Sequence, residues 1–363
     1  MLLSLHHAGD TRHCRGGPLA NTPLPGAALT RSPSIGNLGA LVLSLAAAIG
    51  VVQFYKPDHR LGGGTPFANL AKAMNGVVPA AAVPTTDAFG VSGAVKVRFA
   101  LPGEPVELPL AVGAGTQVLT YQWALVGDST PVAPAAPLTA SPPMAPREPG
   151  FYNLIVTHDG VRETIAEPTL AVMVPFERKL GGWLNGYRLG TYVAERLEGR
   201  HDKPAGFVEV RPEQLGLQVS THLKLADFVT HDDQGDVWPK YVALNPRLLD
   251  KLELVLADLG QRSGRSLAVD VHSGFRSPSH NTSVRRSARD SRHQYGDAAD
   301  IQIDADGDGR ITMTDELLVM LAVERVELRF PDLVGGLGLY TSRRYRTPYL
   351  HIDARGRRSR WHG

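Results

Sequence analysis

Two histidines and one aspartate have the residue types and spacing of a mononuclear zinc site. His293 and Asp300 lie in the stretch SRHQYGDAAD, and His351 lies in the stretch YLHID near the C-terminus. A catalytic zinc takes three protein ligands and keeps its fourth position for water, whose pKa it lowers to about 7. These three side chains fit that number of ligands. The sequence therefore predicts a zinc site of the catalytic kind.

Two short strands are expected to position these ligands. After Gly296, small or apolar residues alternate with polar ones, as in a half-buried strand, so Asp300 and Gln302 share one face. The same period of two in the stretch LHID sends His351 and Asp353 to one side. Two adjacent strands can thus present all three ligands to one cleft.

Four sequence blocks between about residues 268 and 361 resemble the zinc murein endopeptidases of the D-Ala-D-Ala peptidase-like superfamily. The blocks are VHSGFRSPSHN, SRHQYGDAAD, GGLGLY and YLHIDARGRRSRW, in the order of the family's pattern. The resemblance implies an α+β domain with an antiparallel sheet, zinc on His293, Asp300 and His351, and peptidoglycan as substrate. It also implies that Arg276 binds a carboxylate or peptide carbonyl of the substrate, which suits a planar fork of donors. Pairing of Arg276 with a structural carboxylate is the alternative.

The general base departs from the pattern of many relatives. They place a glutamate three residues before the last histidine, and this chain has Pro348 there. Asp353 is the candidate that remains, because it follows His351 by two residues on the same strand face and could accept a proton from water. The alternative role for Asp353 is to orient an imidazole.

A calcium site is predicted immediately after the strand that carries Asp300. Residues 304–315 match the calcium-loop rule, with Gly309 at the sharp turn and an aspartate instead of the longer glutamate at the twelfth position. A solvated acidic turn is the alternative. The expected ligands are Asp304, Asp306, Asp308, the carbonyl of Arg310, Thr312 and Asp315.

Two amphipathic helices are expected beside these sites. The first spans Asn245 to Gly260, with Asn245 as the N-cap before Pro246 and Gly260 at its end. Its inward residues are Leu248, Leu249, Leu252, Val255, Leu256 and Leu259. The second spans Asp315 to Phe330, and its apolar residues at helical spacing are Leu317, Leu318, Leu321, Val323 and Val326.

Composition limits the other possibilities. The chain has 363 residues, enough for at least two cores, and its 38 basic and 36 acidic residues give a formal net charge of +2, which is no signature of nucleic-acid binding. Its single cysteine, Cys14, excludes an intrachain disulfide.

The N-terminal region contains one long apolar run, residues 38–54, with basic residues on both sides. This run is at the short end of what spans a bilayer and predicts an uncleaved signal anchor, a transmembrane helix that holds the protein to a membrane. A cleaved export signal and a buried helix are the alternatives. The expected location is membrane-anchored and periplasmic or otherwise extracytoplasmic, because a wall hydrolase has no substrate in the cytoplasm.

The expected organisation has five parts. Residues 1–60 are the tail and anchor, 61–87 a flexible linker, 88–174 an all-β immunoglobulin-like sandwich, 175–240 a connecting segment and 241–363 the zinc peptidase domain. The sandwich is expected to act as a spacer or to bind the wall or a partner protein. The expected function is zinc-dependent hydrolysis of an amide bond in peptidoglycan stem peptides or crosslinks. The alternatives are a non-catalytic wall-binding module with a structural zinc, and a carboxypeptidase or amidase acting on small D-amino-acid peptides.

Overall fold

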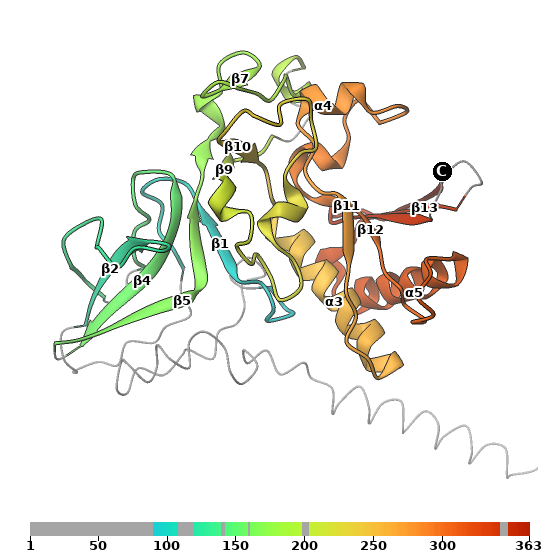
Figure 1. Cartoon of the computed structure of the whole chain (residues 1–363), viewed down its shortest axis with the longest axis horizontal. Helices are drawn as coiled ribbons and strands as arrows, with labels where there is room; N and C mark the ends of the chain where they lie inside the picture. Colours follow the sequence, from blue (N-terminus) through green and yellow to red (C-terminus); the bar gives the residue numbers. More distant parts are fainter. Residues whose placement is uncertain (1–89, 108–118, 139–141, 159, 198–202, 342–347) are drawn as a thin grey trace, which may run out of the picture. The chain divides into compact units, whose positions relative to one another are not determined.

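The computed structural model describes residues 90–363, apart from residues 108–118, 139–141, 159, 198–202 and 342–347 (Figure 1). The predicted anchor, tail and linker lie outside these residues. Within them, none of the helices has the length and apolar character needed to cross a lipid bilayer. The predicted fold class is corrected on this point, because the described chain consists of mixed sheets and few helices, with no transmembrane helix.

The first five strands form one mixed sheet in the order β1-β5-β4-β2-β3. The strands are β1 (Val97–Ala100), β2 (Thr120–Leu125), β3 (Ala136–Pro137), β4 (Gly150–His158) and β5 (Val161–Val172). The long strand β5 pairs antiparallel with β4 and parallel with β1, and β2 and β3 continue the same layer beyond β4. The prediction of a two-sheet immunoglobulin-like sandwich is therefore wrong for the described residues.

The packing of this sheet explains why it needs no second sheet. On one face, Tyr152, Leu170 and Val172 form a small core with Val106 and Leu138. Both of these partners lie outside the long strands, so loop segments cover that face. The alternate residues of the same strands, Val97, Phe151 and Ala171, belong instead to the large core of the following segments.

The segment that follows the sheet is built from short elements. Its three-stranded antiparallel sheet has the order β10-β9-β6, with β6 (Val174–Pro175), β9 (Gly206–Val210) and β10 (Lys240–Val242). A two-stranded hairpin consists of β7 (Trp183–Leu184) and β8 (Tyr187–Arg188). The 3-10 turns are η1 (Phe176–Arg178), η2 (Val193–Glu195), η3 (Pro212–Gln214) and η4 (Leu225–Phe228).

The C-terminal sheet has the order β11-β12-β14-β13-β15. Its strands are β11 (Asp270–Ser273), β12 (Ala298–Gln302), β13 (Gly336–Tyr340), β14 (Tyr349–Asp353) and β15 (Ser359–His362). β12 and β14 are antiparallel neighbours, which confirms the prediction of two adjacent ligand-bearing strands. The expected antiparallel sheet is corrected to a mixed one, because β15 pairs parallel with β13.

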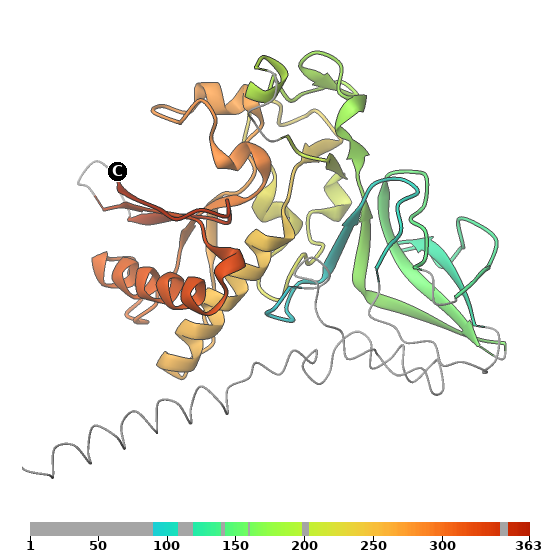
Figure 2. The ribbon, with the colours of Figure 1, turned by 180° about the vertical axis from the view of Figure 1, so that it is seen from behind.

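Two long helices, α3 (Pro246–Ser263) and α5 (Met313–Arg329), pack on the apolar face of this sheet (Figure 2). That face carries Ala299, Ile301, Leu350 and Ile352, which alternate with the polar residues of β12 and β14. The shorter helical elements are α4 (Pro278–Ser283), η5 (Arg292–Tyr295) and η6 (Pro331–Leu333). The other face of the sheet is thereby left for the polar residues.

Both helices differ from their predicted form in detail. Asn245 caps α3 as predicted, with its Oδ1 accepting a hydrogen bond from the Arg247 amide at 3.0 Å. The helix continues through Gly260 and ends at Gly264, whose φ of 69° is the left-handed conformation that stops a helix. In α5, Leu317 and Leu321 are exposed, and the buried apolar residues are Val319, Ala322, Val323 and Val326.

Candidate metal centre

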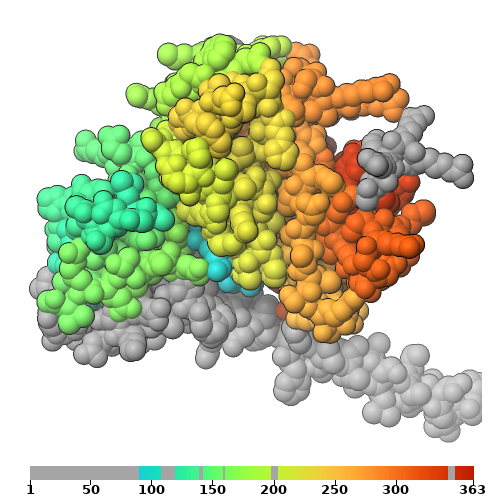
Figure 3. Space-filling view, viewed as in Figure 1, coloured from blue at the N-terminus to red at the C-terminus, as the bar shows by residue number. Residues whose placement is uncertain are grey.

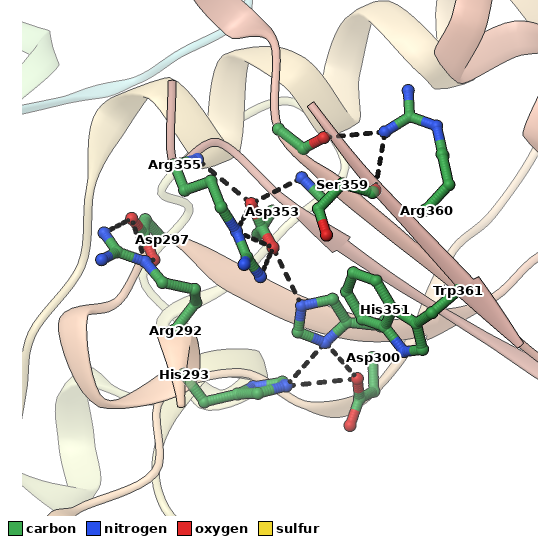
Figure 4. Close-up of polar contacts among 12 residues, drawn as sticks. Arg292, His293, Asp297, Asp300, His351, Asp353, Arg355, Ser359, Arg360 and Trp361 are labelled. Atoms are coloured by element: carbon green, nitrogen blue, oxygen red, sulfur yellow. Dashed lines mark hydrogen bonds and ion pairs between the residues drawn. The ribbon is translucent and has the colours of Figure 1, made fainter. Parts of the chain in front are cut away.

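The three predicted zinc ligands come from three elements and meet at one point (Figure 4). η5 carries His293, β12 carries Asp300 and β14 carries His351, where Asp300 and His351 are direct cross-strand partners. His293 Nε2 lies 3.1 Å from His351 Nδ1 and 3.2 Å from Asp300 Oδ1, and the last two atoms are 3.0 Å apart. All three residues are buried. The fold thus brings two nitrogens and one oxygen into a single triangle.

The triangle fits a tetrahedral zinc ion. Zinc bonds to nitrogen and carboxylate oxygen of about 2.0 to 2.2 Å correspond to ligand separations of roughly 3.3 Å, close to those observed. Burial lowers the pKa of His293, which favours the neutral imidazole that a metal requires. Burial alone would raise the pKa of Asp300, but the neighbouring His293 and His351 outweigh it and hold this pKa well below its ordinary value. His293 and Asp300 therefore favour the protonation states that zinc binds.

The second nitrogen of each imidazole is held by an acceptor. His293 Nδ1 lies 2.7 Å from the carbonyl oxygen of Gly274, so this nitrogen carries the proton and Nε2 is left for the metal. His351 Nε2 lies 3.2 Å from Asp353 Oδ2, which leaves Nδ1 for the metal in the same way. Such partners fix the tautomer and the orientation of a metal-binding histidine.

Asp353 lies behind His351, away from the triangle of donor atoms (Figure 4). Its carboxylate accepts hydrogen bonds from the Gly336 amide at 2.7 Å and from Arg355 Nε at 2.9 Å, and the residue is fully buried. Burial raises the pKa of Asp353, but hydrogen bonds from His351 and Arg355 outweigh this and keep it below its ordinary value. The contacts favour the alternative role, orientation of an imidazole, over that of general base.

The SGFRSP block contributes Arg276, whose side chain contacts the metal ligand Asp300. Arg276 forms an ion pair through Nη2 with Asp300 Oδ2, and its Nε donates to Ser273 Oγ at 2.7 Å. The side chain of Arg276 is 14% exposed, so it is not fully enclosed beside the metal ligand. Ser277 caps α4 by accepting a hydrogen bond from the His280 amide at 3.1 Å. The alternative of a carboxylate partner for Arg276 is thus realised, and that carboxylate is a predicted metal ligand.

The GGLGLY block owes its glycines to close contacts with the site. A side chain at Gly335 or Gly336 would collide with Asp353, and one at Gly338 would collide with the indole ring of Trp361. Gly336 also donates its amide proton to Asp353. Strand β13 therefore approaches the residues around the metal ligands more closely than any larger residue would allow.

Aromatic rings adjoin the ligands on the polar face of the sheet. Trp361 packs on His351 with ring centroids 5.1 Å apart, and its Nε1 donates to Tyr340 Oη at 3.0 Å. Tyr340 and Tyr349 stack with centroids 4.5 Å apart and ring planes 4° apart. These partly buried rings form a wall beside the candidate metal centre.

A buried charge network under the sheet is not visible in the sequence pattern. Lys251 of α3 is fully buried, and its Nζ donates to Glu327 Oε1 of α5 and to the carbonyl oxygen of Asp353, both at 2.7 Å. Glu327 also accepts from the Gly335 amide at 3.0 Å and pairs with Arg360. Neither Lys251 nor Glu327 was among the residues expected on the inner faces of the two helices.

The predicted calcium loop is only partly assembled as a ligand group. Carboxylate oxygens of Asp304, Asp306 and Asp315 lie within 4.8 Å of one another, and the carboxylate of Asp308 is not part of this group. Asp304 and Asp315 both accept backbone hydrogen bonds, which hold the loop and the first turn of α5 together. Because these contacts also suit a solvated acidic turn, calcium binding stays a prediction.

Comparisons with known proteins give one match. Residues 221–316 match the family model described as Peptidase M15, and this stretch contains Arg276, His293 and Asp300. His351 lies beyond the matched stretch, and the structure brings it to the other two ligands. No curated protein and no solved structure was found that matches the chain.

Proposed function

We propose, because residues 221–316 match the Peptidase M15 family model, that this chain is a zinc peptidase that hydrolyses an amide bond in peptidoglycan peptides. The observation that carries the proposal is the buried triangle of His293 Nε2, Asp300 Oδ1 and His351 Nδ1. Two imidazoles and one carboxylate are a ligand set of catalytic zinc sites, which leave a position open for water or substrate.

A zinc ion bound there would supply a Lewis acid that polarises a carbonyl group and lowers the pKa of water. The residues of the chain supply orientation and binding. Gly274 and Asp353 hold the two imidazoles, and Arg276 fixes the second oxygen of Asp300. The exposed part of the Arg276 guanidinium can donate hydrogen bonds to a substrate carboxylate or carbonyl beside the metal. In this proposal Asp353 is a positioning residue and not the base.

The substrate class follows from the family resemblance and not from a bound ligand. Peptidoglycan lies outside the cytoplasm, so the proposal includes an extracytoplasmic location. Among the products, free D-amino acids would indicate carboxypeptidase activity, whereas separated stem peptides would indicate cleavage of crosslinks.

Digestion of purified sacculi tests the proposal. Zinc-loaded protein is expected to release soluble peptide fragments that mass spectrometry identifies, and a chelator is expected to stop their release. The His351→Ala variant is expected to release none, and His362→Ala, which changes an exposed histidine of β15, is the matched control. Release by the His351→Ala variant at the rate of the unchanged protein would refute the assignment.

A non-catalytic wall-binding module with a structural zinc is the second candidate. The observation that favours it is Pro348, which occupies the position of the glutamate base of many relatives and whose carbonyl accepts from Gln302 Nε2 at 2.7 Å. This candidate predicts that zinc-loaded protein sediments with sacculi and releases no fragments under any metal condition. That result would replace the hydrolase proposal.

A further inference from the structure

A pocket with a volume of about 520 Å³ lies at the start of α3, and none of the three predicted metal ligands lines it. β1, the segment before β9, the β10–α3 connection and η5 all contribute to its walls. Figure 3 shows β1 in cyan between the green and yellow parts of this face of the molecule. The volume is within the range of small-molecule sites, roughly 300 to 1,000 Å³.

The charged residues of the lining are mostly basic. Arg98, Lys203, Arg247 and Arg292 line the pocket together with a single carboxylate, Asp297. The lining therefore has a formal excess of three positive charges. Such an excess in a concave site attracts an anion.

The basic residues are not equally engaged. Arg292 pairs with Asp297 through Nε at 3.0 Å, and its guanidinium lies 4.6 Å from the ring centroid of Tyr295. Lys203 pairs with Glu177 at 3.1 Å, outside the lining. Within the described part of the chain, the side chain of Arg247 makes no hydrogen bond or ion pair. Arg247 is thus the cation in the pocket best placed to meet a ligand.

The arginines near the C-terminus give a contrast. Arg355 is bound to Asp353, and Arg358 and Arg360 are bound to Glu324. These basic residues are already neutralised by partners within the fold. Among the described residues, Arg247 differs from these arginines because its side chain has no acidic partner.

We propose that this pocket binds an organic anion through a carboxylate or phosphate group that contacts Arg247. The apolar lining, which includes Phe99, Leu244 and Tyr295, would hold the remaining part of the ligand. The positive end of the 18-residue helix α3 adds to the attraction, because Arg247 lies in its first turn. Binding at this pocket is independent of the hydrolytic reaction.

Backbone hydrogen bonds connect the pocket to the segments that carry the metal centre. The Asn245 amide donates to the Gly296 carbonyl at 2.9 Å, and Gly296 ends the turn that carries His293. Because a zinc ion also attracts anions, an experiment must separate the two sites. The metal-free protein provides that separation.

Calorimetric titration of the full chain with benzoate, phenyl phosphate and the neutral analogue benzamide tests the proposal. Benzoate or phenyl phosphate is expected to bind, and the same affinity is expected with and without zinc. The Arg247→Gln variant is expected to bind the anion about tenfold more weakly, as for the loss of one charge-assisted hydrogen bond. Benzamide is expected to bind the unchanged protein at least about tenfold more weakly than the anion.

The control is Arg262→Gln, which changes an exposed arginine on the same helix outside the pocket. It is expected to retain the affinity of the unchanged protein. A preference for phenyl phosphate or for benzoate identifies the anionic group. The proposal would be overturned if the Arg247→Gln variant and the unchanged protein bound the anion with equal affinity. It would also be overturned if neither anion bound, or if binding required zinc. None of these results depends on peptidase activity.

Discussion

At the scale of single residues, the candidate metal centre depends on acceptors that choose which imidazole nitrogen faces the metal. Gly274 contributes a backbone carbonyl to His293, and Asp353 contributes a carboxylate to His351. The carboxylate is itself fixed by Arg355 and by the Gly336 amide. A substitution of Asp353 is therefore expected to change the zinc affinity through the orientation of His351, although Asp353 is not itself a ligand.

The Asp353→Asn variant is expected to bind zinc about 10- to 100-fold more weakly, because an amide no longer holds His351 in the required tautomer. Competition with a chromogenic chelator measures this affinity, and circular dichroism checks the fold. Asp332→Asn, which changes an exposed carboxylate, serves as the control and is expected to leave the affinity unchanged. Unaltered zinc affinity of Asp353→Asn would show that Asp353 has no positioning role.

At the scale of elements, strand β13 and helix α5 each contain a residue whose surroundings affect stability: close packing at a glycine in β13, and burial of a carboxylate in α5. β13 needs glycine, because its backbone touches Asp353 and Trp361 directly. The helix α5 instead buries Glu316, whose two carboxylate oxygens have no hydrogen-bond partner among the described residues. The glycines of β13 are therefore required for packing, whereas the buried charge of Glu316 lowers the stability of the folded state.

The Gly338→Ala variant is expected to lose about 1 to 3 kcal/mol of unfolding free energy, because the new methyl group collides with Trp361. Its tryptophan fluorescence is expected to shift as the indole moves. Gly216→Ala, where a methyl group meets no atom within 4 Å, is the matched control. A denaturation midpoint equal to that of the unchanged protein would contradict the close packing of β13 and β15.

Glu316 is expected to make stability fall as pH rises. Burial raises its pKa from 4.5 to about 7, so the folded chain holds a proton that the unfolded chain releases above pH 4.5. The folded state therefore loses stability between about pH 4.5 and 7, by on the order of 3 kcal/mol.

Denaturant unfolding of the unchanged protein and of Glu316→Gln at pH 5 and pH 8 measures this effect. The glutamine variant is expected to be the more stable of the two at pH 8 and to show a smaller difference between the two pH values. Glu213→Gln, at an exposed glutamate, is expected to behave as the unchanged protein. An identical pH response of Glu316→Gln and the unchanged protein would rule out ionisation of Glu316 as the cause.

At the scale of the whole molecule, the metal ligands join elements that are far apart in the chain. His293 and His351 are 58 residues apart, and the ligand-bearing strands lie over a core that includes α3 and α5. Lys251 and Glu327 connect the two helices to the backbone of β14 beneath the site. Metal binding is therefore expected to stabilise the C-terminal part of the fold as a unit.

Removal of zinc with a chelator is expected to lower the unfolding temperature by several degrees, and added zinc is expected to restore it. A ligand at 1,000 times its Kd stabilises the folded state by about 4 kcal/mol. Differential scanning calorimetry measures the change. The His351→Ala variant is expected to show no response to zinc, whereas His362→Ala is expected to respond fully. An unfolding temperature that is insensitive to zinc in the unchanged protein would contradict the site.

The sequence allowed the ligand strands and the start of α3 to be predicted, because these depend on local patterns. The period of two placed Asp300 and His351 on one face, and Asn245 before Pro246 marked a helix start. The single-layer N-terminal sheet was missed because the parallel pairing of β1 with β5 joins segments distant in sequence. The inward face of α5 was misjudged because Leu317 and Leu321 share the helical period without facing the sheet.

The order of the ligands along the chain has a consequence for biosynthesis. His351 follows His293 by 58 residues and Asp300 by 51, so a nascent polypeptide on the ribosome has just two of the three donors until β14 has been synthesised. A copy that stalls or is clipped before β14 lacks the donor that closes the triangle. Ion capture therefore requires that synthesis has passed β14, and copies truncated before this strand lack a complete site.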